Sequence, residues 1–167
     1  MPKGGDRILG DANKQKDVKK MAADEKKVEL VIFLLLEDYY AFIGSDIKEI
    51  LSVGSITYVP GSPDFILGII NVRGDIESVF DIHKFLGLPD VKIVRKSRIA
   101  IADKDGVRSA ILIDSVKDVI DVPANSIKPP ISTLDKSIQE FVVGETTYNK
   151  KNVTVFDVGK IFGKLTG

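Results

Sequence analysis

The chain repeats one pattern of apolar residues, glycines and aspartates, and this repeat limits its fold more than any other feature. A first set of matches, at an offset of 69 residues, pairs Ala41, Phe42, Ile43, Ile47, Ile50 and Leu51 with Ala110, Ile111, Leu112, Val116, Val119 and Ile120. A second set, at an offset of 76, pairs Phe65, Gly68, Val79, Phe80, Asp81, Lys84 and Gly87 with Phe141, Gly144, Val155, Phe156, Asp157, Lys160 and Gly163. A pattern that occurs twice in 167 residues predicts two similar small lobes packed together.

Short apolar runs on either side of turn residues predict the strands of these lobes. The expected pairs are Leu30–Leu36 with Tyr39–Ile43, Phe65–Val72 with Ile76–Phe80, Arg98–Ala102 with Val107–Ile113, and Phe141–Thr147 with Val153–Phe156. Asp105-Gly106 is the strongest turn signal, because a type I′ turn needs positive φ at both central residues. Many short strands at this spacing predict a mostly β fold of the barrel or sandwich type.

Short helices are predicted at two places in each copy. The first place has apolar residues at i, i+3 and i+4, after an N-cap residue: Ile47, Ile50 and Leu51 after Asp46, and Val116, Val119 and Ile120 after Ser115. At the second place the expected N-caps are Asp81 and Asp157, and the expected stops are Gly87 and Gly163.

The first 27 residues differ in composition from the rest of the chain. They are rich in Lys, Asp, Gly and Ala and contain no aromatic residue. Such a segment buries too little apolar area to order itself, so residues 1–27 are predicted to be a charged, mobile tail, with a short helix over Asp17–Lys27 as the alternative. Residues 28–167 are the predicted folded domain, with approximate lobes at 28–90 and 95–167 between which strands can be exchanged.

Charge and composition argue against several classes of function. Lys plus Arg and Asp plus Glu both total 24, so the basic excess typical of nucleic-acid binders is missing. The absence of cysteine removes disulfides, thiol nucleophiles and Cys-ligated metals. The longest uncharged apolar run, Leu30–Leu36, is far shorter than the roughly 20 residues that a membrane-spanning helix needs. The expectation is a cytoplasmic protein that does not bind nucleic acid or insert into the membrane.

Motifs that would indicate an enzyme are missing. His83 is the single histidine, and a lone histidine on a short helix is more often a packing or surface residue than a catalytic base. The sequence has no glycine-rich phosphate loop, nucleophile elbow or HExxH motif, so we expect no catalytic residues, no cofactor and no metal site. Two alternatives stay open: an enzyme with a paired-carboxylate site, and a small-barrel ligand or nucleic-acid binder.

One segment carries a family resemblance. Residues 59–74 read VPGSPDFILGIINVRG, and Val79-Phe80-Asp81-Ile82 follow. A proline-bounded loop, an apolar strand with a glycine, an Ile-Asn-x-Arg-Gly turn and then a strand that ends in Asp resemble the CheW family, the coupling proteins of bacterial chemotaxis. Ile47-Lys48-Glu49-Ile50 and Ile113-Asp114-Ser115-Val116 resemble further motifs of that family. The resemblance extends from about Val28 to Gly163.

The resemblance implies a fold, a function and partners. The fold would be two five-stranded, SH3-like barrels. The function would be that of a non-enzymatic adaptor between a CheA-type histidine kinase, bound at its regulatory domain, and the cytoplasmic tip of methyl-accepting chemoreceptors. The chain departs from the family at Asp75, in the strand Ile76–Val79 and at Ala110, and these departures leave open a divergent scaffold that serves a non-flagellar pathway.

Six residues are the candidate partner-binding positions. They are Ile47, Glu49, Gly68, Asn71, Arg73 and Gly74. Arg73 is the first choice, because an arginine at a hairpin tip offers five N–H donors to a partner. Asn71 and Gly74 also have structural interpretations, as a turn former and a positive-φ residue, and Gly68 with its repeat partner Gly144 is interpreted as a β-bulge or a point of close backbone approach. Ile47 could pack in the core and Glu49 could cap a helix.

Overall fold

The computed structural model describes residues 26–90, 92–130 and 135–166, which form ten strands and several short helices. The strands are β1 (Lys27–Leu35), β2 (Asp38–Ile43), β3 (Ile47–Ser52), β4 (Ile66–Val72), β5 (Asp75–Asp81), β6 (Arg98–Lys104), β7 (Val107–Ile113), β8 (Ser115–Pro123), β9 (Val142–Tyr148) and β10 (Lys151–Phe156). The helices are η1 (Gly44–Asp46), α2 (Ile82–Leu86), η2 (Ala124–Ser126), α3 (Lys136–Gln139) and α4 (Val158–Thr166). The first 25 residues of the expected tail lie outside the described residues, and Lys27 is already part of β1.

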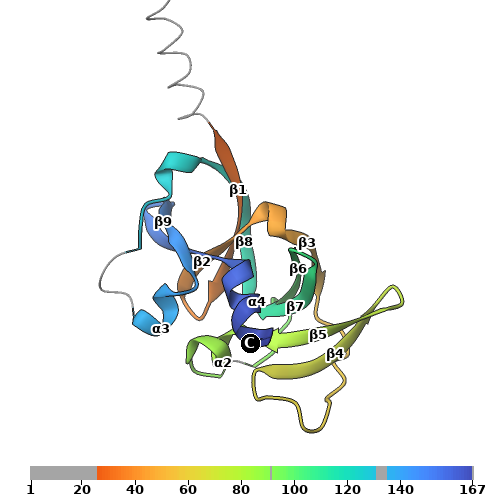
Figure 1. Ribbon diagram of the computed structural model, residues 1–167. Coiled ribbons are helices and arrows are strands. Elements are labelled where there is room, and N and C mark those ends of the chain that lie inside the picture. The colour runs from red at the N-terminus through yellow and green to blue at the C-terminus, as the bar shows by residue number, and fades with distance from the viewer. Residues whose placement is uncertain (1–25, 91, 131–134, 167) are drawn as a thin grey trace, which may run out of the picture.

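The strands form two five-stranded sheets that lie side by side (Figure 1). Sheet A has the order β8-β1-β2-β10-β9, and sheet B has the order β3-β6-β7-β5-β4. Each half of the chain contributes to both sheets, because β1 and β2 join sheet A whereas β3, β4 and β5 join sheet B. The mostly β prediction is confirmed, and the strands of the approximate lobes 28–90 and 95–167 are divided between the two sheets.

The internal repeat reappears as matching strand pairs in the two sheets. In sheet B, β5 runs parallel to β7, with Phe80 opposite Ile111. In sheet A, β10 runs parallel to β2, with Phe156 opposite Phe42. Each sheet also curls toward a barrel through a short extra bridge, Thr57 with Ile69 in sheet B and Lys128 with Glu145 in sheet A. We refer to these units as barrel A and barrel B.

Three apolar clusters form the core, one inside each barrel and one between the barrels. One fills barrel A, with Leu30, Ile32 and Val155 among its members, and another fills barrel B, with Val79 and Ile101 among its members. The largest lies between the barrels and draws on both sheets: Phe33, Leu35, Tyr40, Phe42, Phe80, Ile82, Leu86, Ala100, Ala102, Ile111, Ile113, Phe141, Val142, Phe156, Val158, Ile161 and Phe162. Because the largest core is shared, neither barrel can bury all of its apolar surface without the other.

The helices predicted after Asp46 and Ser115 are wrong, because both segments are strands. Ile47–Ser52 pairs with β6 and Ser115–Pro123 pairs with β1, each with a β-bulge near its start. A bulge adds one residue and so places positions i and i+3 on the same face, which imitates the spacing of a helix. The side chain of Asp46 pairs with Lys104 at 3.3 Å and caps no helix.

The helices predicted after Asp81 and Asp157 are confirmed, although the second is longer than predicted. Asp81 caps α2 by accepting a hydrogen bond from the backbone N–H of His83, and Gly87 ends that helix with φ 72°. Asp157 accepts in the same way from the N–H of Lys160 at the start of α4. The predicted stop at Gly163 is wrong, because α4 continues to Thr166. Its apolar side packs against the shared core, which offsets the low helix propensity of glycine.

Candidate partner-binding site

The turn between β4 and β5 places Asn71, Arg73 and Gly74 at the tip of a long hairpin that projects from barrel B (Figure 1). Arg73 and Gly74 both have positive φ, 52° and 93°, as a type I′ turn requires. The Asn71 Oδ1 accepts a hydrogen bond of 2.8 Å from the N–H of Gly74, which fixes the turn. The structural roles predicted for Asn71 and Gly74 are therefore present, and they hold Arg73 in an outward position.

Arg73 and Glu49 form a bidentate ion pair at the end of barrel B. The Arg73 Nη1 donates to Glu49 Oε1 at 2.8 Å, and Nη2 donates to Oε2. The side chain of Arg73 is 69% exposed and that of Glu49 is 28% exposed. The hydrogen bond from Arg73 lowers the pKa of Glu49, and the same bond raises the pKa of Arg73. Both groups are thus charged at neutral pH, and the pair with Glu49 uses two of the five guanidinium N–H groups.

A second ion pair lies beside the first and was missed by sequence reasoning. The Arg108 Nε donates toward Glu77 Oε1 at 2.7 Å, and the charge of Arg108 also contributes to the lowered pKa of Glu49. Glu77 is buried, two residues before the core residue Val79 on β5. Strand alternation was the available signal, because a carboxylate on the inward side of a strand requires a partner. The four side chains of Glu49, Arg73, Glu77 and Arg108 are called the charged tip below.

The remaining candidate residues have structural roles away from the charged tip. Ile47 is partly buried against the shared core, so the core interpretation is the one that the packing supports. A Cβ built on Gly68 would lie 2.2 Å from the carbonyl oxygen of Thr57, at the bridge that closes barrel B. Gly144 has the same relation to Lys128 in barrel A, at 2.3 Å. The predicted close approach at both glycines is confirmed, and Gly68 presents no side chain to a partner.

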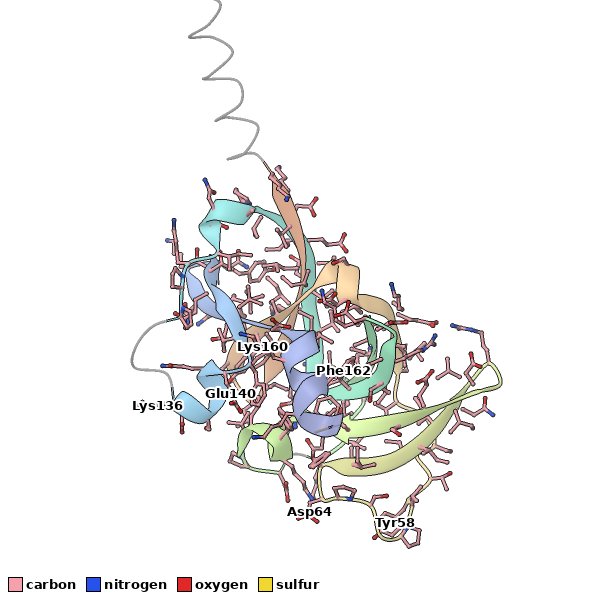
Figure 2. The ribbon with its side chains drawn as sticks, in the orientation of Figure 1. Tyr58, Asp64, Lys136, Glu140, Lys160 and Phe162 are labelled. Atoms are coloured by element: carbon pink, nitrogen blue, oxygen red, sulfur yellow. The ribbon has the colours of Figure 1, made fainter. Side chains whose placement is uncertain are left out.

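The proline-bounded loop at 53–65 joins β3 to β4 of barrel B, and the ring of its last residue, Phe65, lies 6.3 Å from that of Phe85 in α2. Figure 2 shows Tyr58 and Asp64 on the outside of this loop, and Tyr58 is 69% exposed. Between this loop and the hairpin is a hollow of about 200 Å³ lined by Leu51, Ser52, Gly54, Ser55, Ile70, Asn71, Val72 and Ile99. The hollow shares Asn71 with the turn that carries Arg73, so a partly apolar hollow borders the charged tip.

His83 is buried between two carboxylates, that of Asp81 at the end of β5 and that of Asp114 between β7 and β8. Its Nδ1 lies 2.9 Å from Asp81 Oδ1, and its Nε2 makes an ion-pair contact of 2.8 Å with Asp114 Oδ1 outside hydrogen-bond geometry. The other oxygen of Asp114 accepts a hydrogen bond from the N–H of Leu36 in the β1–β2 turn. Burial opposes the charged imidazolium, but the two carboxylates prevail and raise the pKa of His83. Of the two roles predicted for His83, packing or surface, the structure shows a buried residue.

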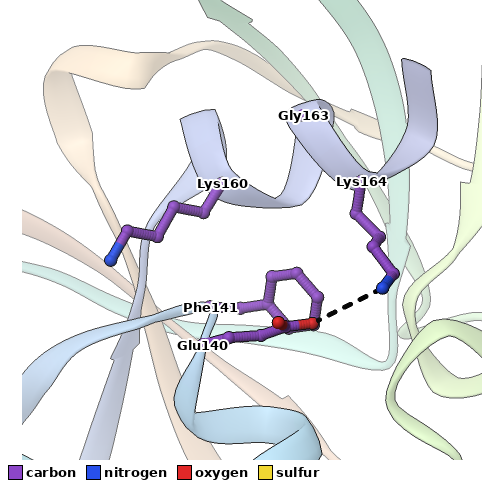
Figure 3. Close-up of a pocket in the computed structure, with 5 residues that line it drawn as sticks. All are labelled: Glu140, Phe141, Lys160, Gly163 and Lys164. Atoms are coloured by element: carbon purple, nitrogen blue, oxygen red, sulfur yellow. Dashed lines mark ion pairs between the residues drawn. The ribbon is translucent and has the colours of Figure 1, made fainter. Parts of the chain in front are cut away.

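A second hollow lies between α4 and the start of β9 in barrel A. Its volume is about 380 Å³ and it is lined by Glu140, Phe141, Lys160, Gly163 and Lys164. Figure 3 shows the ring of Phe141 beneath α4, with Lys164 paired to Glu140 at 3.8 Å and Lys160 extended away from that pair. This hollow contains no histidine, serine or cysteine that could act as a nucleophile or base.

Within the described part of the chain, no helix is long and apolar enough to cross a membrane.

Comparisons with known proteins agree with this architecture. A family model described as the CheW-like domain matches residues 29–165. The chain is 28% identical over 149 residues to the chemotaxis protein CheW of Thermotoga maritima, a match that covers 89% of this chain and 97% of that protein. It is 25% identical over 146 residues to CheW of Treponema pallidum, with 85% and 86% covered.

A solved structure extends the likeness to three dimensions. The scaffolding protein TtCheW from Thermoanaerobacter tengcongensis superposes with a TM-score of 0.70 at 34% identity, over 78% of this chain and 84% of that one. This likeness confirms the predicted fold of two SH3-like barrels with short helices.

Proposed function

The chain belongs to the CheW-like domain family, and from this membership we propose that it is a non-enzymatic adaptor that couples chemoreceptors to a CheA-type histidine kinase. The names of its relatives support this role, since they are chemotaxis proteins and one solved relative is described as a scaffolding protein. The proposed partners are the regulatory domain of the kinase and the cytoplasmic tip of the receptors, and the proposed location is accordingly the cytoplasm.

The charged tip is the observation that carries the proposal. Arg73 is held outward by a rigid turn, and Glu49 fixes the plane of its guanidinium while using two of its five N–H groups. A planar donor set that is oriented before binding loses less side-chain entropy when a partner engages it. The geometry therefore suits recognition of a carboxylate or of backbone carbonyls on another protein.

The proposed mechanism is scaffolding. Each contact is expected to be modest, with a dissociation constant near the micromolar range, and simultaneous binding of several partners adds avidity. The adaptor would transmit a signal by favouring one arrangement of the kinase over another, because a binding partner can shift a conformational equilibrium only by its different affinities for the two states. The burial and double pairing of His83 support a role without catalysis, because this imidazole has no free access to a substrate.

Assembly of three components tests the adaptor function directly. A receptor cytoplasmic fragment and a kinase regulatory domain from the same organism are mixed with and without the chain, and complexes are followed by size-exclusion chromatography with light scattering. The proposal predicts a species that contains all three proteins only when the chain is present. Binding of the folded chain to neither protein would contradict it.

A further inference from the structure

Among the described residues, the chain crosses between the two sheets at two short segments, and each segment carries an aspartate. Asp46, in η1, lies where the chain leaves sheet A for sheet B, and Asp114 lies between β7 of sheet B and β8 of sheet A. Asp46 is buried and Asp114 is half-buried. A carboxylate that is largely removed from water requires a partner, and each of these two contacts a basic side chain.

The contact at Asp114 joins elements of both barrels. Its Oδ1 lies 2.8 Å from the Nε2 of His83 on α2, while its Oδ2 accepts a hydrogen bond from the N–H of Leu36 in the β1–β2 turn. The backbone N–H of Asp114 also donates to the carbonyl of Leu34 at 3.2 Å. Leu36 has φ 59°, which a leucine rarely adopts, so the carboxylate holds this turn in a conformation that its sequence disfavours.

The contact at Asp46 is the counterpart at the other crossing. Its Oδ1 lies 3.3 Å from the Nζ of Lys104, at the end of β6. The stem of Lys104 lies against the start of α4, because a Cβ built on Gly159 would be 3.4 Å from its Cγ. Gly159 holds the same repeat position as His83, so a lysine takes the place of the histidine at this crossing. The hydrogen bond with Asp46 raises the pKa of Lys104, so this contact stays charged at neutral and moderately alkaline pH.

The imidazole can satisfy both of its carboxylates only while it is protonated, because a neutral histidine has one N–H and one lone pair. Its Nδ1 forms a hydrogen bond of 2.9 Å with Asp81, whereas the contact of Nε2 with Asp114 lies outside hydrogen-bond geometry. The neutral form therefore keeps its proton on Nδ1 and turns the lone pair of Nε2 toward Asp114. That contact is then repulsive, and water screens it poorly because His83 is buried.

The charged groups that face the imidazole are Asp81 from the end of β5 and Asp114 from the β7–β8 junction. Burial opposes the charged form, but these two carboxylates raise the pKa of His83 above the ordinary value near 6.5. The other charged side chains of the surrounding elements are exposed or paired elsewhere: Lys84 on α2, Glu37 and Asp38 in the β1–β2 turn, Lys117 on β8, and Arg108 on β7 with Glu77 on β5.

We propose that the contact between His83 and Asp114 is a pH-dependent link between the barrels, which fixes the β1–β2 turn while His83 is protonated and frees it when the proton is lost. The two oxygens of a carboxylate move together, so repulsion at Oδ1 also displaces Oδ2 from the N–H of the turn. The contact of Asp46 with Lys104 persists, so the change is confined to one crossing. It takes place within the chain, and the inference therefore goes beyond the proposed adaptor function.

Loss of this link changes an exposed surface of barrel A. Without its carboxylate acceptor, Leu36 returns to the negative φ that its side chain prefers. Glu37 and Asp38 move with the turn, and they line a hollow of about 340 Å³ together with Lys150 and Lys151. The proton on a buried histidine thus controls the shape of this hollow.

NMR of the isotope-labelled full chain tests the proposal in the wild type, from about pH 5 to about pH 10. The ring nitrogens of His83 report its proton, and the amide proton of Leu36 reports the hydrogen bond to the carboxylate through a downfield shift. Both should titrate with one midpoint, with the Leu36 amide moving upfield as pH rises, while the amides of Asp46 and Lys104 stay in place through that step. A fixed Leu36 amide while His83 titrates, or an imidazole whose charge never changes over this range, would overturn the proposal.

A matched pair of variants replaces the basic side chain at each crossing by glutamine. Because glutamine is neutral at every pH, the Leu36 amide should no longer titrate in His83→Gln, whereas in Lys104→Gln it should titrate as in the wild type. Titration of Leu36 that persists in His83→Gln would assign it to another group, and its loss in both variants would show that the two crossings are not separate. Either result would overturn the proposal, and the wild-type titration decides it even if a variant fails to fold.

Discussion

The two barrels have the same architecture but different side chains at their ends. In both, a bulged strand precedes the proline-containing loop, a glycine makes a close backbone contact, and an Asp caps a helix after the hairpin that follows this loop. At the end of barrel B, Glu49 pairs with Arg73 and Glu77 pairs with Arg108. The residues at the same repeat positions in barrel A are Asp118, Asn149, Val153 and Tyr39.

The end of barrel A is closed instead by a tyrosine–carboxylate hydrogen bond and a pair of tyrosine rings. Asp118 accepts a hydrogen bond of 2.7 Å from the hydroxyl of Tyr148, which raises the pKa of that tyrosine. The ring of Tyr148 lies 6.0 Å from that of Tyr39, which is opposite Val153 in the sheet. The difference shows that the repeat preserves the residues that build the barrel, whereas the side chains at the barrel ends have diverged. Partner recognition is best assigned to positions where the two copies differ, and Arg73 is one of them.

The largest expected effect concerns the core that the barrels share. Phe80 and Phe156 hold the same repeat position and are both fully buried in it. Phe80→Ala and Phe156→Ala should each lower the free energy of unfolding by about 4 kcal/mol, measured by urea denaturation. Because the core is common to both barrels, each variant should still unfold in one transition. Two separate transitions in either variant would show that the barrels are independent units.

The next largest effect on stability is expected at Gly68 and Gly144, the two glycines that lie against a neighbouring backbone. An added Cβ at Gly68 or Gly144 would meet a backbone carbonyl at 2.2 or 2.3 Å, and Gly68 also has φ 153°. Gly68→Ala should cost about 3 kcal/mol and Gly144→Ala about 2 kcal/mol of unfolding free energy. Gly54→Ala is the control, because its added Cβ meets nothing within 4 Å. Equal stability of all three variants would mean that neither bridge closes its barrel as tightly as described.

The unfolding free energy should depend on pH through a histidine in barrel B. His83 stands there, whereas barrel A has Gly159 at the same repeat position. The pKa of His83 is raised, so its contribution to stability is complete below the unfolded value near 6.5 and is lost as pH rises through the folded pKa. Burial opposes ionisation of Asp81, but its hydrogen bonds with His83 lower its pKa, so that contribution is lost as pH falls through the folded value.

The variant His83→Gln should remove the loss of stability on the alkaline side. Its unfolding free energy at pH 6 should be about 2 kcal/mol below that of the wild type, because a buried charge-assisted contact is lost, and the gap should narrow as pH rises. Thermal unfolding across a pH series measures this. A constant difference at every pH would show that the imidazole is not charged in the folded protein.

The smallest effects on stability are expected at the charged tip, where its two ion pairs should differ in their contribution. Arg108→Gln should cost about 1.5 kcal/mol, because it leaves the carboxylate of Glu77 buried without its partner. Arg73→Gln should leave the unfolding free energy within experimental error, since a solvent-exposed pair contributes little. If Arg73→Gln were as destabilising as Arg108→Gln, Arg73 would be a structural residue.

The sequence predicted correctly those elements that depend on neighbouring residues, such as tight turns. The prediction failed where strand pairing produced a residue spacing that is typical of a helix. The hairpins at Arg73-Gly74 and Asp105-Gly106 were predictable because positive-φ turns demand particular residues. The helices expected at Ile47 and Val116 were wrong because a β-bulge reproduces helical spacing, and a bulge is defined only by the partner strand.

For the candidate site, the sequence identified individual residues but not the contacts between them. Arg73 and Glu49 were both identified, but their ion pair joins residues 24 apart in the chain and depends on the tertiary fold. The Glu77–Arg108 pair and the contact of His83 with Asp114 were missed for the same reason, since no local spacing connects these residues.

The most direct test of the central claim is calorimetric titration of the kinase regulatory domain and of a receptor cytoplasmic fragment with Arg73→Glu and with Lys151→Glu. Both variants change an exposed cation to an anion, one at the charged tip and one in barrel A. The account predicts that Arg73→Glu weakens binding to at least one partner by about tenfold or more, while Lys151→Glu binds both like the wild type. Unchanged binding of both partners by a folded Arg73→Glu variant would contradict the assignment of the charged tip as a partner surface.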